Sequence, residues 1–374
     1  MTLSQSERER YQRHLALLEI GTAGQEKLKA ARVLIVGAGG LGSPAALYLA
    51  AAGCGTLGLL DCDCIELSNL QRQVLFDTGE LGRAKADAGA ERLAALNPAI
   101  RIVAHRAELK AANVRELFSQ YDLVLDGTDR LATRYLINDA CVILSLPLVS
   151  AAIHRFEGHL MTYVPGRGPC YRCLFPNSAD GLVANCSQAG VLGVLPGVLG
   201  TLQATEAIKL ITGVGEPLIG RLLTYDALQM RFQQFTMTRR VDCAVCGDAP
   251  TIREPFDALP PGGGATARGR DIRRLSAPEL AQLLGTAPLL VDVREVREFS
   301  AGHLQGSVNI PLGQLPQQLA QIAPDAAPVF ICRSGGRSLA ACQMALQANI
   351  AAPANLEGGL IAWAAEVDPA LYVL

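Results

Sequence analysis

A glycine-rich turn is the first segment of the chain whose residues could do chemistry. Residues 37–42 (GAGGLG) follow an apolar run and precede a helical pattern. Small residues at such a turn let the backbone approach phosphate groups, and the N-terminus of the following helix favours their negative charge. Asp61 comes 24 residues after Gly37, where an acidic side chain accepts hydrogen bonds from ribose hydroxyls. The pattern predicts a nucleotide site, and by itself it fits NAD, FAD or ATP.

Charged residues beyond the turn distinguish between these ligands. Arg72 lies in the run SNLQRQ (68–73), Lys85 follows that run, and Asp129 ends the run DGTD (126–129). Adenylyl transfer from a triphosphate needs several cations and an acid for magnesium, whereas hydride transfer needs few cations beside the nucleotide. A Walker A lysine motif is absent from the sequence, which argues against transfer of the γ-phosphate. We therefore favour ATP with Mg²⁺, and keep a dinucleotide-dependent oxidoreductase with a fused sulfur-handling module as the alternative.

Two Cys-x-x-Cys pairs indicate a metal centre. Each spacing lets both sulfurs reach one tetrahedral ion, and 69 residues separate the pairs, so they must meet through tertiary structure. Four thiolates close the coordination shell, which predicts structural Zn²⁺ rather than catalytic zinc. The expected ligands are Cys170, Cys173, Cys243 and Cys246.

Two further cysteines are candidates for sulfur chemistry. Cys332 opens the loop CRSGGRS (332–338) between an apolar strand and a helical pattern, where backbone N–H groups and a helix N-terminus stabilise a thiolate or persulfide anion. Cysteine phosphatases use C-x5-R, but here the arginine, Arg337, comes one residue sooner, and the tighter loop suits a single sulfur atom. Cys186 lies in NCSQAG (185–190), and both a nucleophilic role and an ordinary loop cysteine remain open for it.

Alternating strands and helices position these motifs. The first part predicts a Rossmann-like, doubly wound, mostly parallel α/β sheet, with strands over 32–36, 55–60, 100–104 and 123–125 and helices over 41–52 and 83–96. A proline- and glycine-rich stretch then predicts a linker over 251–270. A smaller α/β domain follows over 271–374, with strands over 289–293 and 329–331 and a helix over 337–347.

Composition narrows the class of protein. The formal net charge is −2, which does not favour a nucleic-acid binder or a membrane-surface protein. The chain contains 11 cysteines and begins without the apolar stretch of a signal peptide. We therefore expect thiol and metal chemistry in the cytoplasm rather than a disulfide framework.

The motifs of residues 7 to 248 together resemble the MoeB/ThiF family, the bacterial relatives of ubiquitin-activating enzymes. The resemblance rests on GAGGLG, on D-x-D-x-x-x-x-SNLxRQ and on DGTD. It implies that Gly39 and Gly40 line the phosphates, that Asp61 binds ribose and that Asp129 lies near magnesium. The remaining residues that it places at the nucleotide are Ser68, Asn69, Leu70, Gln71, Arg72, Gln73, Lys85 and Thr128.

The same resemblance implies a homodimer. In the family, an R-Y-x-R segment lends an arginine across a dimer interface, and residues 10–13 match it, so Arg13 would act in trans. MoeB-like proteins also carry zinc at positions matching the four cysteines. Cys186 matches the position of a thioester or acyl-disulfide cysteine in some members. Arg130 departs from the family, which has asparagine after DGTD.

Residues 271 to 371 resemble a rhodanese domain. The loop opened by Cys332 is accompanied by DVRE (292–295), GHL (302–304), NIP (309–311) and EGG (357–359). This resemblance implies that Cys332 carries sulfur as a persulfide.

The order of the two domains, 1–250 and 271–374, resembles MoeZ-type fusions. It implies ATP-dependent adenylation of the C-terminal glycine of a ubiquitin-like sulfur-carrier protein ending in Gly-Gly, then sulfur transfer to give a thiocarboxylate. The sulfur would come from a cysteine desulfurase or thiosulfate and would serve molybdopterin, thiamine, cysteine or tRNA-thiolation chemistry. The implied catalytic residues are Arg13, Arg72, Asp129, Cys332 and Cys186. No motif encodes which carrier or donor is used.

Overall fold

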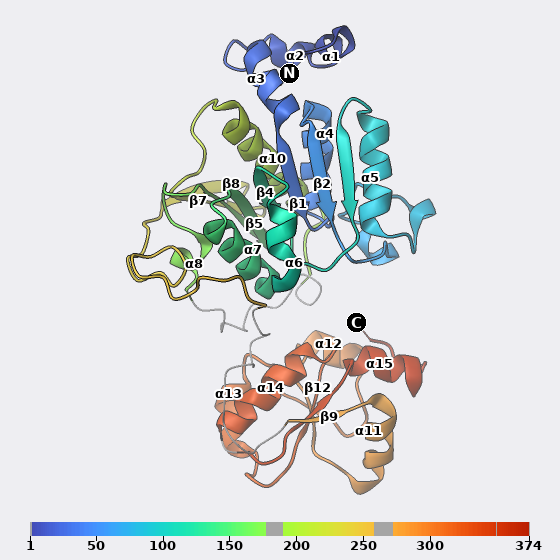
Figure 1. Cartoon of the computed structure of the whole chain (residues 1–374). Helices are drawn as coiled ribbons and strands as arrows, with labels where there is room; N and C mark the ends of the chain where they lie inside the picture. The colour runs from blue at the N-terminus through green and yellow to red at the C-terminus, as the bar shows by residue number, and fades with distance from the viewer. Residues whose placement is uncertain (1, 177–189, 258–271, 349, 374) are drawn as a thin grey trace. The chain divides into compact units, whose positions relative to one another are not determined.

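The computed structural model describes residues 2–176, 190–257, 272–348 and 350–373 (Figure 1). The chain divides into two compact units, Met1–Ala258 and Leu259–Leu374. Most of the predicted linker (258–270) lies outside the described residues. None of the helices in the described ranges is long and apolar enough to cross a membrane.

The first unit is built on an eight-stranded sheet of order β3-β2-β1-β4-β5-β6-β7-β8. The strands from β3 to β5 are parallel, and β5 to β8 are antiparallel. Strand order reverses between β1 and β4, which is where ligands bind in open α/β sheets. The strands are β1 (Arg32–Val36), β2 (Thr56–Leu60), β3 (Arg101–His105), β4 (Leu123–Asp126), β5 (Leu148–His154), β6 (Glu157–Tyr163), β7 (Arg221–Asp226) and β8 (Arg231–Thr236).

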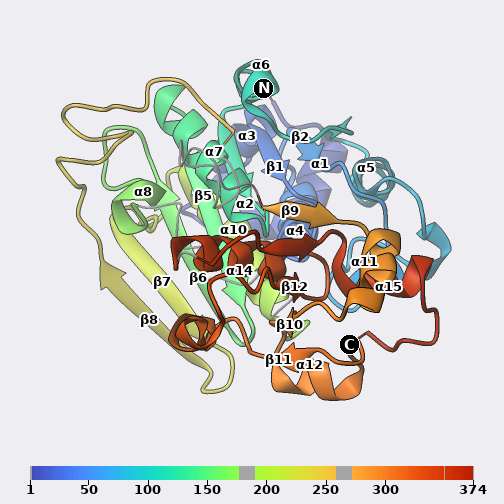
Figure 2. The same ribbon diagram turned by 90° about the horizontal axis from the view of Figure 1, so that it is seen from below.

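Helices cover both faces of this sheet, as Figures 1 and 2 show. Strand β1 explains why: Val33 and Ile35 pack into one apolar core, while Leu34 and Val36 pack into the other, because successive side chains point to opposite faces. The first core contains α4 (Gly42–Ala52), α5 (Lys85–Leu96) and α10 (Leu195–Thr212), and the second contains α6 (Ala111–Phe118) and α7 (Leu131–Ile143). Three helices precede β1, namely α1 (Gln5–Arg10), α2 (Gln12–Leu15) and α3 (Gly21–Ala30), and the short α8 (Tyr171–Leu174) follows β6. The predicted doubly wound α/β fold is confirmed.

The second unit has a five-stranded parallel sheet of order β11-β10-β12-β13-β9. Phe330 of β12 packs on one face with α14, and its neighbours Val329 and Ile331 pack on the other with α11 and α15. The strands are β9 (Arg273–Leu275), β10 (Leu290–Asp292), β11 (Val308–Asn309), β12 (Val329–Ile331) and β13 (Ala354–Leu356). The helices are α11 (Ala277–Leu283), α12 (Val296–Ala301), α13 (Leu315–Gln318), α14 (Gly336–Gln347) and α15 (Gly359–Glu366).

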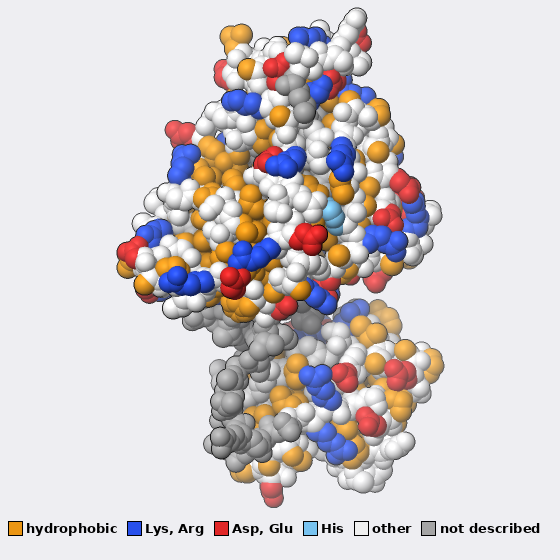
Figure 3. Space-filling model, in the orientation of Figure 1, with side chains coloured by type: hydrophobic (Ala, Val, Ile, Leu, Met, Phe, Trp, Pro, Cys, Tyr) orange, Lys and Arg blue, Asp and Glu red, His pale blue; other side chains and the backbone are white. Residues whose placement is uncertain are grey.

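Surface charge agrees with the small net charge. On the described parts of the face drawn in Figure 3, Lys and Arg side chains are mixed with Asp and Glu, and charges of one sign form no large area.

The glycine turn between β1 and α4 is packed too closely for larger residues. A Cβ atom added to Gly42 would lie 1.8 Å from the carbonyl oxygen of Gly37, and Gly37 itself has a φ of +93°. By contrast, the nearest atom to an added Cβ at Gly39 is a side-chain nitrogen of Gln73, 3.7 Å away.

We expect Gly42→Ala to destabilise the first unit by about 1–3 kcal/mol, because the turn must move to admit the methyl group. Gly39→Ala, the matched control, should unfold like the wild type. Thermal unfolding of the nucleotide-free proteins tests this. Equal melting temperatures for the two variants would contradict the close packing.

Candidate active site and metal centre

A single cavity of about 710 Å³ runs from the glycine turn to the antiparallel strands of the first unit. One end lies at the carboxyl ends of β1, β2 and β4, and the other lies over β5 to β8 and α8. Of the residues predicted at the nucleotide, those that line it are Gly39, Gly40, Asp61, Arg72, Gln73, Lys85, Thr128 and Asp129.

Asp61 ties the glycine turn to the end of β2. One carboxylate oxygen accepts a hydrogen bond from the backbone N–H of Ala38 at 2.8 Å, and the other accepts from that of Asp63 at 2.8 Å. Burial raises the pKa of the Asp61 carboxyl above its usual value, although these two bonds oppose the shift. Each oxygen keeps a further lone pair that can accept a ribose hydroxyl.

Two cations lie beside the glycine turn. Lys85 is buried at the start of α5, with its Nζ 3.4 Å from an Asp63 carboxylate oxygen. Arg72 packs beside Gly40 and donates to the backbone oxygen of Ser68 at 3.0 Å. Because Asp63 is largely exposed, a negatively charged ligand in the cavity can compete for Lys85. This end can therefore hold a polyphosphate.

A buried acid organises the turn at the end of β4. Asp126 is fully buried and accepts from the hydroxyl of Thr128 at 2.7 Å, the hydroxyl of Ser150 at 2.8 Å and Nε of Arg134 at 3.1 Å. Arg134 also donates to the backbone oxygen of Thr128 at 2.7 Å. Asp126 therefore shapes the turn from inside, while Asp129 lies exposed at the cavity wall.

The other predicted residues have different surroundings. Leu70 packs against the apolar core, and Asn69 is buried and accepts from the backbone N–H of Glu66. Arg13 is exposed on α2, outside the cavity lining of its own chain. Ser68 and Gln71 flank Asn69 and Leu70 on the loop that leads to Arg72, and Cys186 lies outside the described residues.

Arg130, the departure from the family pattern, lies at the rim of the cavity. Its guanidinium is 3.4 Å from a carboxylate oxygen of Glu108, and both side chains are about half exposed. An ion pair this exposed contributes little to stability.

The far end of the cavity is aromatic, which the sequence did not predict. His159 of β6 packs on Phe175, with ring centroids 5.7 Å apart, and Tyr171 lies 4.8 Å from Phe175. The Nε2 of His159 is buried and has no partner among the described residues. Burial, followed by the charge of Arg134, lowers the pKa of His159 to about 4, so the ring is neutral near pH 7.

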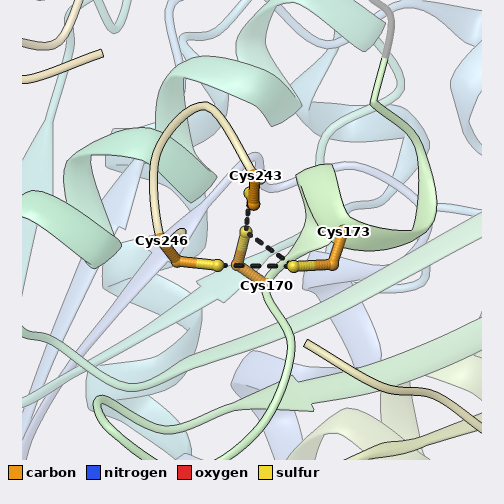
Figure 4. Close-up of side chains that lie close together, drawn as sticks. All are labelled: Cys170, Cys173, Cys243 and Cys246. Carbon is orange, nitrogen blue, oxygen red and sulfur yellow. Dashed lines mark hydrogen bonds between the residues drawn. The ribbon is translucent and has the colours of Figure 1, made fainter. Parts of the chain in front are cut away.

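Four cysteines converge beside α8 (Figure 4). Their sulfurs lie within 4.8 Å of one another and point toward a common centre. Three of the separations are 3.3, 3.7 and 4.0 Å, close to the roughly 3.8 Å that tetrahedral zinc with 2.3 Å bonds requires. Hydrogen bonding from Cys170 lowers the pKa of Cys173 and Cys243, while hydrogen bonds within the cluster raise the pKa of Cys170, so the four sulfurs share protons when no ion is bound. The predicted convergence of the two pairs is confirmed, and the donor set fits a structural zinc ion.

Cys332 lies at the end of β12, just before α14, in the second unit. Its sulfur accepts from the backbone N–H of Gly335 at 3.1 Å and lies 3.2 Å from the hydroxyl of Ser338. Arg337 forms two hydrogen bonds with Glu298, at 2.7 and 2.6 Å. Ser338 stands where a C-x5-R phosphatase loop has its arginine, so the loop suits a sulfur anion better than a phosphate.

Comparisons with known proteins match both units of the chain. A ThiF family model matches residues 11–245, and a model of the rhodanese-like domain matches residues 276–366. The probable adenylyltransferase/sulfurtransferase MoeZ of Mycobacterium tuberculosis is 41% identical, over 98% of this chain and 95% of its own. The adenylyltransferase and sulfurtransferase MOCS3 of Sus scrofa is 42% identical, over 98% and 87%. A crystal structure of E. coli MccB with ATP covers 65% of this chain and 75% of its own, with 26% identity and a TM-score of 0.59.

We expect His159 to make the first unit sensitive to acid. Its folded pKa of about 4 lies below the unfolded value near 6.5, so the unfolded state binds more protons between these limits, and stability falls as pH falls from 6.5 to 4. The contribution is fully present above pH 6.5 and amounts to roughly 3 kcal/mol. Unfolding midpoints of the wild type and His159→Gln across this range test it. Parallel pH profiles for the two proteins would refute the assignment.

Proposed function

This chain belongs to the ThiF family and continues into a rhodanese-like domain, and from that premise we propose that it adenylates the C-terminal glycine of a ubiquitin-like sulfur-carrier protein and then replaces AMP by sulfur. The chain is an enzyme with an adenylyltransferase and a sulfurtransferase part. The oxidoreductase alternative has no support from the relatives, which are named as transferases.

The observation that carries the proposal is the pair Arg72 and Lys85 beside the glycine turn, in one cavity with Asp129. The carrier carboxylate attacks the α-phosphorus of ATP, the bond to the bridging oxygen breaks, and pyrophosphate leaves. Arg72 and Lys85 offset the charge that develops on the phosphates. Asp129 is our candidate to hold Mg²⁺, which would supply positive charge beside the phosphates. Gly39, Gly40, Gln73 and Thr128 would surround the same nucleotide.

Arg13 is the residue that we assign to a second subunit. It is exposed on α2 and does not reach the cavity of its own chain, so it can contribute only across a homodimer interface. Leu17 and the almost fully exposed Leu18 follow it, and apolar side chains such as these favour burial against a partner.

The sulfur step uses Cys332. A cysteine desulfurase or thiosulfate supplies sulfane sulfur, giving a persulfide on Cys332. Its terminal sulfur attacks the acyl carbon, the bond to AMP breaks, and an acyl disulfide joins the carrier to Cys332. The N–H of Gly335 and the hydroxyl of Ser338 would stabilise the sulfur anion before the attack.

Release of the thiocarboxylate needs a second thiol. A thiolate attacks Sγ of Cys332, the S–S bond breaks, and its electron pair leaves with the thiocarboxylate. Cys186 is our candidate for this thiol. The resulting disulfide with Cys332 is then reduced by a cellular thiol, which fits a cytoplasmic location.

Cys332→Ala tests whether adenylation and sulfur transfer are carried out by different units of the chain. We expect ATP–pyrophosphate exchange with a Gly-Gly-ending carrier to stay within about twofold of wild type, because Cys332 belongs to the other unit. Thiocarboxylate formation should be lost. Cys342→Ala, which removes another buried cysteine of the same unit, is the control for folding. Loss of exchange in the Cys332 variant alone would contradict the assignment.

Arg13→Ala tests the dimer. Exchange should fall about a hundredfold, as when one transition-state donor is removed. Mixing this variant with Asp129→Ala should restore about a quarter of the wild-type rate per site, since half the dimers are mixed and each has one intact site. If subunits exchange freely and no activity returns, Arg13 does not act in trans.

A further inference from the structure

The four-residue helix α8 serves the metal centre and the cavity at the same time. Cys170 caps its N-terminus, and Cys173 lies in its last turn, so both contribute sulfur to the cysteine cluster. Tyr171 lies between them, Phe175 follows the helix, and both line the aromatic end of the cavity. Successive side chains of one turn therefore face two different sites.

A helix this short cannot hold its own shape in water. The first set of contacts that fixes α8 comes from α7. Arg172 donates twice to Asp139, both at 2.7 Å, and the two side chains are almost completely buried. The backbone N–H of Tyr171 donates to Asn138 at 2.8 Å, and the hydroxyl of Tyr135 donates to the backbone oxygen of Phe175 at 2.9 Å.

The second set of contacts runs through sulfur. Cys173 lies 3.3 Å from Cys246, and Cys170 lies 3.7 Å from Cys243, so a segment about 70 residues further along the chain meets α8 at these atoms. The backbone N–H of Arg240 also donates to the sulfur of Cys173 at 3.4 Å. Without a metal ion, these contacts are weak thiol hydrogen bonds. With zinc, each of the four sulfurs would bind the ion instead, and the ion would hold the cysteine side of α8 to the segment that carries Cys243 and Cys246.

We infer that the metal centre positions the aromatic wall of the cavity, with Arg172 as the positioning residue that links the cysteine cluster to α7. The wall formed by Tyr171 and Phe175 lies at the end away from the glycine turn. Because the proposed function puts the nucleotide at the glycine turn, we assign the aromatic end to the acyl substrate. The opposite end depends on Asp61 and Asp126, whose hydrogen bonds involve the glycine turn, the turn after β4 and β5. The two ends meet at Arg134, which bonds Asp126 and lies 5.8 Å from the centre of the Tyr171 ring. Metal loss should therefore weaken binding of the carrier tail more than binding of ATP.

Hydrogen–deuterium exchange on the full-length protein tests the positioning directly, without a substrate. Removal of the metal by a chelator under reducing conditions should speed exchange in the peptide that contains residues 165–176. A peptide covering β1 and the glycine turn, residues 32–42, is the internal control and should not change. No change at 165–176, or an equal change in both peptides, would overturn the inference.

A substitution that leaves the cysteines intact gives the second arm. Arg172→Ala leaves the four cysteines in place, so it should retain one zinc per chain. It should raise the KM for a Gly-Gly-ending carrier about tenfold, because α8 loses both hydrogen bonds to Asp139. The KM for ATP should change less than about twofold, and Arg172→Lys should restore part of the loss because it keeps the charge but not both hydrogen bonds. Arg32→Ala is the matched control, since its side chain also donates two hydrogen bonds to one carboxylate, that of Asp122, but at the surface and outside the cavity lining.

The inference rests on the proposed function, and the two experiments, hydrogen exchange and the kinetics of Arg172→Ala, distinguish a failure of one from a failure of the other. An Arg172→Ala enzyme with an unchanged carrier KM, or with equal increases for carrier and ATP, would overturn the positioning role. If no carrier supports exchange with the wild type, the proposed function fails, and the hydrogen-exchange result alone then decides whether the metal holds the wall.

Discussion

The site in the first unit depends on one buried charge, the carboxylate of Asp126. A buried carboxylate is stable only when hydrogen bonds and an opposite charge replace its lost water. Thr128, Arg134 and Ser150 supply them, and in doing so fix the turn after β4, the first turn of α7 and the middle of β5. The glycine turn packs closely against the same region. A Cβ atom added at Gly37 would lie only 2.9 Å from the backbone oxygen of Gly127. One constraint thus brings the glycine turn and Asp129 to a shared cavity.

The two units share a strand–turn–helix arrangement, but the turns suit different anions. In both, a parallel strand ends in a glycine-containing turn, and a helix begins. In the first unit, Arg72 and Lys85 stand beside the turn, which suits a polyphosphate. In the second, Arg337 is held by Glu298, and the sulfur of Cys332 meets an N–H and a hydroxyl. One site can thus activate an acyl group, and the other can hold the sulfur that replaces AMP.

The sequence predicted those features of the fold and of the sites that depend on short runs of residues. The run Arg32–Val36 is a strand because it is apolar and ends at glycine, and the two Cys-x-x-Cys pairs converge because each can contribute half of a tetrahedral site. The sequence did not predict the aromatic end of the cavity. His159 lies there because of the register of β6 between β5 and β7, which no local pattern encodes. The run DGTD indicated a site but not that Asp126 faces inward. Nor could the sequence show that Arg337 is taken up by Glu298, 39 residues away.

The central claim is that one chain makes an acyl group reactive with AMP and then gives it sulfur. Mass spectrometry of a Gly-Gly-ending carrier, incubated with the wild-type enzyme, ATP, magnesium and a sulfur donor, tests that claim most directly. We expect a carrier in which one C-terminal oxygen is replaced by one sulfur, and only when ATP is present. A carrier of unchanged mass, across the ubiquitin-fold proteins of the source organism, would contradict it.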